Sequence, residues 1–107
     1  MMEMIKALKE VYDVDDCKYI LDGGCVSGAA SSHIYYSQTN SFYDMYEEEV
    51  VEYVMNNMGD NYPACLFVEN DYSIVSYKNA MVWCAIECYA FEVCDEELMR
   101  ERFQWYS

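Results

Sequence analysis

The sequence contains little proline and glycine, only one and four among its 107 residues. No Ser/Gly-rich linker, low-complexity tract or internal repeat divides the chain, and its length is enough for one modest core. No apolar run reaches the ~18 residues that cross a bilayer, and the N-terminus lacks the basic start and apolar core of a signal peptide. These absences predict a single acidic domain over residues 1–107, located in a cytosol and without a membrane partner.

Familiar metal and phosphate motifs are also absent. The chain has no Cys-x2-Cys pair, no calcium-binding loop, no phosphate-cradling loop and no dinucleotide fingerprint. Its six cysteines do not indicate a disulfide scaffold, because Cys84, Cys88 and Cys94 fall in one strongly helical segment. Side chains four apart on a helix have Cβ atoms ~5–6 Å apart, farther than the ~3.5–4.5 Å of a disulfide. We expect reduced, core-filling thiols, and we predict no metal, no cofactor and no catalytic residue.

Basic residues are scarce: six stand against twenty acids, for a formal net charge of −14. Such a charge repels phosphates, which excludes nucleic acid as a direct ligand and disfavours anionic membranes. It favours basic partners, among them the grooves of nucleic-acid-binding proteins. The simpler interpretation is an ordinary soluble acidic protein.

Hydrophobic periodicity predicts helices along most of the chain. The expected helices cover residues 2–12, 15 or 16 to 23, 37–59, 73 or 76 to about 93, and the stretch that follows Asp95. The segment YKNAMVWCAIECYAFEV is apolar on nearly every face, which is typical of a central buried helix. Glu87 lies within it, and a buried carboxylate needs a partner or stays protonated. The predicted fold is mainly α, a compact helical bundle around this helix; the alternative is α+β with one small sheet near residues 62–70.

The stretch GGCVSGAASSHIYY, residues 23–36, holds three of the four glycines and the only histidine. If it is helical, Gly24, Gly28 and Ser32 are spaced four apart and let another helix approach closely. The catalytic alternative pairs Cys25 as nucleophile with His33 as base. It lacks a third orienting residue, and GCVSG does not match the nucleophile-elbow pattern. We therefore favour a tight helix crossing.

An acidic series occupies the predicted helix 37–59. The predicted partner-binding residues are Tyr43, Asp44, Glu47, Glu48, Glu49 and Glu52. Asp44, Glu48 and Glu52 repeat every four residues over ~12 Å of helix, and such like-charge pairs cost ~0.2–0.5 kcal/mol each. No lysine or arginine occurs between residues 18 and 78 to offset this cost. Because one DNA strand carries a phosphate every ~3.4 Å, the series coarsely imitates a nucleic-acid backbone. The alternative is a solvated outer face with its tyrosines packed inward.

Several short blocks carry two family resemblances. Gly-Cys-x-Ser-Gly at 24–28, Ile-Tyr-Tyr-Ser at 34–37 and Phe-Tyr at 42–43, followed by an acidic helix, resemble a family of small phage and mobile-element proteins. This match covers about a third of the chain and implies phage or mobile-element origin, without a known activity. The ECYA of residues 87–90 is similar to one helix of antirestriction proteins of the ArdB/KlcA type. Small acidic phage proteins are often inhibitors of host defence, such as anti-CRISPR proteins.

Three functional hypotheses follow. The first is a non-enzymatic inhibitor in the bacterial cytoplasm that binds the basic nucleic-acid groove of a host defence effector, for example a CRISPR nuclease or a restriction enzyme. The second is a homo-oligomeric interaction protein, such as a homodimer joined through Phe103, Trp105 and Tyr106. The third is a thiol- or metal-dependent enzyme that uses Cys25 with His33, or the pair Cys84 and Cys88.

Overall fold

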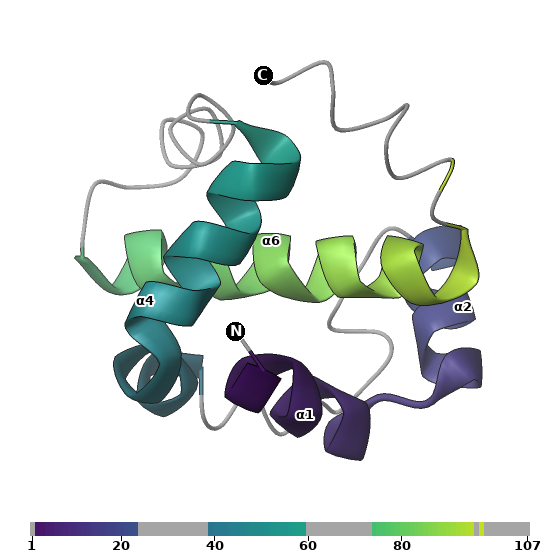
Figure 1. Ribbon diagram of the computed structural model, residues 1–107, viewed down its shortest axis with the longest axis horizontal. Coiled ribbons are helices and arrows are strands. Elements are labelled where there is room, and N and C mark those ends of the chain that lie inside the picture. The colour runs from purple at the N-terminus through teal and green to yellow at the C-terminus, as the bar shows by residue number, and fades with distance from the viewer. Residues whose placement is uncertain (1, 24–38, 60–73, 96, 98–107) are drawn as a thin grey trace.

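The computed structural model describes residues 2–23, 39–59, 74–95 and 97, and these ranges contain helices and no strand (Figure 1). The helices are α1 (Met2–Val11), α2 (Val14–Gly23), α4 (Thr39–Met58) and α6 (Ile74–Cys94). The predicted mainly α-helical class is therefore confirmed. The alternative with a small sheet concerns residues 62–70, which lie outside the described residues.

Helix α6 forms the centre of this arrangement. In Figure 1 it runs across the molecule, α4 crosses it near one end, α2 lies at the other end and α1 lies below. The main helix–helix interfaces are those of α6 with α4 and with α2. Ten of the twelve side chains from Ala80 to Phe91 are buried. A helix that buries nearly every face must be apolar all round, so the prediction of a central buried helix is confirmed.

One strip of α6 does reach the surface. Asn79, Trp83 and Glu87 follow one another at four-residue spacing, and each is half-buried. The burial of Glu87, which the sequence leaves open, is therefore only partial. Two apolar residues of this helix are also not fully buried, because Val93 is exposed and Trp83 is half-buried. Val93 lies in the last turn of α6.

The boundary between α1 and α2 is set by two aspartates. The Asp16 amide donates to Asp13 Oδ1 at 2.8 Å, and the Asp13 amide donates to Asp16 Oδ2 at 3.1 Å. This reciprocal pair is a capping box, which satisfies amides that the first turn of a helix leaves unpaired. Asp13 is therefore the N-cap, and the helix begins at Val14 rather than at Asp15 or Asp16. The usual capping-box motif does not indicate this pair, because Asp16 stands at the third helical position in place of the usual glutamate.

Helix α4 buries one apolar side against the core but is not straight. Phe42, Val50, Tyr53 and Val54 are buried, and Tyr46 on the same side is half-buried. Tyr46 has non-helical backbone angles (φ −122°, ψ 26°), which place a kink in the middle of the helix. Gly59 ends the helix in a left-handed conformation with φ 79°, and its amide donates to the Met55 carbonyl at 3.1 Å. Glycine adopts this conformation without steric cost, so the predicted C-terminal stop is confirmed.

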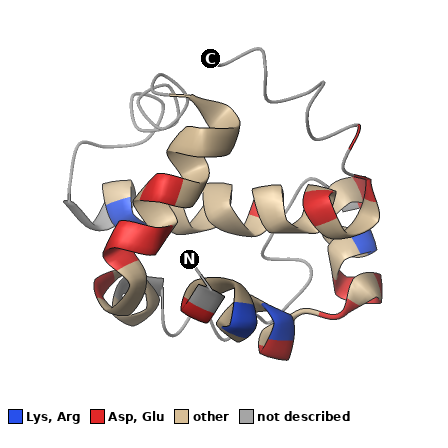
Figure 2. Cartoon of the chain, in the orientation of Figure 1, with Lys and Arg blue, Asp and Glu red and all other residues tan. Residues whose placement is uncertain are grey.

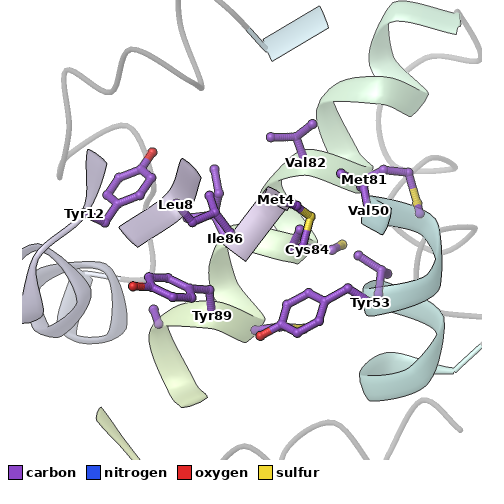
Figure 3. Packing of buried hydrophobic residues seen from close by; sticks show 14 of the residues in the cluster. Met4, Leu8, Tyr12, Val50, Tyr53, Met81, Val82, Cys84, Ile86 and Tyr89 are labelled. Atoms are coloured by element: carbon purple, nitrogen blue, oxygen red, sulfur yellow. The ribbon is translucent and has the colours of Figure 1, made fainter. Parts of the chain in front are cut away.

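The core joins α1, α2, α4 and α6 through closely packed apolar side chains. In Figure 3 the labelled residues of these helices point into one common interior. One polar link accompanies the packing: the buried Tyr53 hydroxyl of α4 donates to Glu92 Oε2 of α6 at 2.5 Å. Burial first, and then the Glu92 carboxylate, raise the pKa of Tyr53 well above its usual range, so the hydroxyl stays protonated and acts as the donor.

Several predictions fall on parts of the chain outside the described residues. They are the close crossing at Gly24–Ser32, the pair Cys25 and His33, and the C-terminal patch with Phe103, Trp105 and Tyr106. Within the described ranges, no helix is long and apolar enough to cross a membrane.

Candidate interaction surface

Helix α4 carries five acids and no base. In Figure 2 its visible side shows acidic residues and no basic one. Asp44, Glu47, Glu48 and Glu52 are exposed, and Glu49 is half-buried. The kink at Tyr46 separates Asp44 from the other four, so the acids do not form the straight ladder that their spacing predicted.

Asp44 has a cationic partner. Its Oδ1 atom lies 2.5 Å from Lys78 Nζ of α6, and the two side chains are 61% and 22% exposed. The same ammonium lies 5.6 Å from the centre of the Tyr43 ring. An ion pair with this exposure contributes only about 0.2–1 kcal/mol to stability. It nevertheless compensates the first acid of the series with a base that is 34 positions away and therefore invisible to local spacing.

Glu49 has a structural role. Its Oε2 atom accepts the Met4 backbone amide at 2.6 Å. Met4 lies in the first turn of α1, where amide groups lack helical partners and the helix dipole is positive. A carboxylate from α4 thus caps α1 and fixes the two helices to each other. The sequence offered no signal for this contact, because the two residues are 45 positions apart.

Tyr43 is not part of an exposed face, which corrects its prediction as a partner-binding residue. Its side chain is only 5% exposed and belongs to the hydrophobic core. Burial, followed by the neighbouring Glu47 carboxylate, raises the pKa of Tyr43 from 10.0 to about 12. For this tyrosine the alternative of inward packing is correct, and the ring supports the helix rather than offering contact area.

Three of the predicted residues remain as an exposed acidic surface: Glu47, Glu48 and Glu52. We call this set the α4 acidic surface. Glu48 and Glu52 are one turn apart, so their carboxylates repel each other. No ion pair to a lysine or arginine is found for them within the described residues. The repulsion is tolerated because both side chains stand in water, where opposite charges from a partner are also accessible.

The kink region forms a shallow acidic hollow of about 320 Å³. It is lined by Asp44, Met45, Tyr46, Glu47, Glu48 and Glu49. The four carboxylates make it a place where a cation is favoured electrostatically. Across the described part of the chain, however, no group of three or more His, Cys, Asp or Glu side chains is arranged to hold a metal ion.

An apolar groove of about 240 Å³ lies beside this hollow, between α1 and α4. We call it the α1–α4 groove; its main lining residues are Ala7, Glu10, Val11, Phe42, Met45 and Tyr46. The Phe42 and Tyr46 rings pack together with centroids 4.9 Å apart. Met45 is 70% exposed and, like Tyr46, borders both the groove and the acidic hollow. The spacing of residues along the sequence does not indicate this groove, because Met45 falls between the buried apolar residues and the exposed acids of its helix.

The thiols in the described ranges are free, and three of them are buried: Cys17, Cys84 and Cys88. Burial is the main cause that raises the pKa of each of the three, to about 12 for Cys17. A nucleophilic cysteine needs the opposite, an accessible sulfur with a lowered pKa. The pair Cys84 and Cys88 therefore fills the core, as expected for reduced thiols.

The helices and surface define the class of this protein as a mainly α-helical, strongly acidic domain. The chain belongs to the family described as Domain of unknown function (DUF7222), whose profile matches residues 3–99. No curated protein and no solved structure matches the chain. The resemblances to small phage proteins and to ArdB/KlcA-type antirestriction proteins stay predictions.

Proposed function

We propose that this protein is a non-enzymatic inhibitor that binds a basic nucleic-acid groove through the α4 acidic surface. One observation carries the proposal. Glu47, Glu48 and Glu52 are exposed on a helix that contains no base, while Asp44 pairs with Lys78 and Glu49 caps α1. Glu47 also lies beside the Tyr43 hydroxyl, a neutral partner that leaves its charge uncompensated. A surface that served solubility alone would mix charges of both signs.

The proposal includes a biological setting. The effector is a nucleic-acid-binding protein of host defence, such as a CRISPR nuclease or a restriction enzyme, in the cytoplasm of a bacterium. The protein itself comes from a phage or mobile element. This part is supported by the resemblance of residues 24–43 to small phage proteins and by the net charge of −14.

Charge reversal tests the binding surface. We expect Glu48→Lys with Glu52→Lys to abolish inhibition, because the variant repels the groove that the native helix attracts. The assay is DNA cleavage by a panel of purified CRISPR nucleases and restriction enzymes with the protein added. Effectors captured from host lysate at low salt and released at high salt, as charge-dependent binding requires, extend the panel.

The matched control reverses Asp15 and Asp22, two exposed acids of α2, and gives the same net charge. It should inhibit as the native protein does. Equal loss in both variants would mean that net charge matters and the α4 acidic surface does not. Unchanged inhibition by the Glu48/Glu52 variant would refute the proposed surface.

A further inference from the structure

The α1–α4 groove and the acidic hollow are neighbours, since Met45 and Tyr46 border both of them. The groove has mostly apolar walls, from Ala7 and Val11 on one side and Phe42 on the other. The hollow beside it is surrounded by carboxylates. Apolar and acidic subsites thus lie on the order of one helical turn (~5 Å) apart along α4.

We propose that this combined site binds a single amphipathic, basic protein segment of the partner. One apolar side chain of the segment, such as leucine or phenylalanine, enters the α1–α4 groove and packs against Met45. A lysine or arginine about one turn away reaches into the acidic hollow. The inference rests on the proposed function and names its partner more closely, as a segment with an apolar anchor rather than a uniformly charged groove.

Charge complementarity specifies this occupant. Glu10 borders the groove on the α1 side, and Glu47 and Glu48 border the hollow, so the charged side chains that line the two subsites within the described residues are acids. A nucleic acid or an acidic peptide is repelled from such a rim. A second copy of this chain would also be repelled, because each copy has a formal net charge of −14. A basic segment gains from both subsites, because its cations meet the carboxylates while its apolar residue covers an otherwise exposed methionine.

The exposure of Met45 makes the test feasible. A side chain that is 70% exposed contributes little to the core, so Met45→Ala should fold normally. Burial of a methionine side chain against a ligand is worth on the order of tenfold in affinity. Tyr19, which is 53% exposed on α2, provides the matched control for loss of an exposed apolar side chain.

Two synthetic peptides of equal length and charge serve as probes. One carries leucine at helical spacing among lysines, and in the other alanine replaces every leucine. By fluorescence anisotropy, we expect the native protein to bind the leucine peptide about tenfold more tightly than the alanine peptide. Met45→Ala should remove most of this difference, and Met45→Gln should do the same. Tyr19→Ala should leave both affinities unchanged.

The outcomes separate this inference from the proposed function. Equal binding of both peptides, or an unchanged preference in the Met45 variants, overturns the anchored segment and leaves the α4 acidic surface in place. Glu47→Gln with Glu48→Gln should weaken both peptides and reduce the salt dependence; no effect of these changes would overturn the acidic surface itself. A native protein that is dimeric in solution and becomes monomeric with Met45→Ala would assign the groove to a second copy, against the inference.

Discussion

The hydrogen bond between Tyr53 and Glu92 predicts that the effect of Glu92→Ala on the free energy of unfolding changes sign when Tyr53 is replaced by phenylalanine. In the native protein, Glu92→Ala leaves the buried Tyr53 hydroxyl without its acceptor, 2.5 Å away. An unsatisfied buried hydroxyl costs about 1–3 kcal/mol. Glu92 also lies in the last turn of α6, where a negative charge interacts unfavourably with the helix dipole. Its removal therefore stabilises the fold by about 0.5 kcal/mol. We expect a net loss of about 1.5 kcal/mol from the free energy of unfolding.

Tyr53→Phe has a smaller expected effect. It removes the donor, and the Glu92 carboxylate, which is exposed, returns to water. The loss is that of one hydrogen bond, about 1 kcal/mol, or about 4 °C in Tm for a chain of this length. Without the hydroxyl, Glu92 keeps only its unfavourable interaction with the helix dipole. In the Tyr53→Phe background, Glu92→Ala should therefore be neutral or stabilising by about 0.5 kcal/mol.

Urea unfolding of the native protein, the two single variants and the double variant measures all four free energies. We expect a coupling energy of about 1–2 kcal/mol in this cycle. An equal cost of Glu92→Ala in both backgrounds would refute the coupling, since the two side chains would then act independently. An unchanged urea dependence, or m-value, across the four proteins verifies that the comparison concerns the same unfolding reaction.

Further predictions concern the helix cap, the ionisable core and the packing of α6. Glu49→Ala should destabilise by about 1 kcal/mol because α1 loses its cap, whereas Glu48→Ala should be nearly neutral; thermal unfolding by circular dichroism compares them. Burial is the main cause that raises the pKa of Cys17 from 9.0 and of Tyr43 from 10.0, each to about 12. The unfolded chain therefore releases these protons first, so urea midpoints should fall as the pH rises from about 9 to about 12. Ile86→Ala, at a fully buried position of α6, should cost about 2–5 kcal/mol in urea unfolding, and a cost below about 1 kcal/mol would contradict its central position.

The sequence predicts the helices well because their signal is local. The apolar composition around Ile86 is repeated over five turns and is sufficient to identify a buried helix without knowledge of its neighbours. Gly59 likewise stops α4 through its own conformational freedom. The kink at Tyr46 has no comparable signal, since neither proline nor glycine occurs there. The sequence therefore predicts a straight helix and with it a regular acidic ladder.

The surface was harder to predict because its partners are distant in sequence. The spacing of Asp44 and Glu49 is the same whether they face water or another helix. Lys78 and the Met4 amide reach them only once α6 and α1 have packed against α4. Tertiary contact thus divides acids that look equivalent in the sequence into those that stabilise the fold and those that are accessible to a partner.

Glu48 and Glu52 should have opposite effects on the stability of the free protein and on the binding of a partner. Glu48 and Glu52 repel each other across one turn and have no compensating ion pair within the described residues. Replacing both by glutamine should therefore stabilise the isolated protein by about 0.2–0.5 kcal/mol, measured as a higher urea midpoint with an unchanged m-value. The same variant should lose inhibition, because the charges that destabilise the free helix are those that attract the basic partner. A variant that is less stable than the native protein would mean that these acids have partners within the fold, and the case for the α4 acidic surface as a binding site would fail with it.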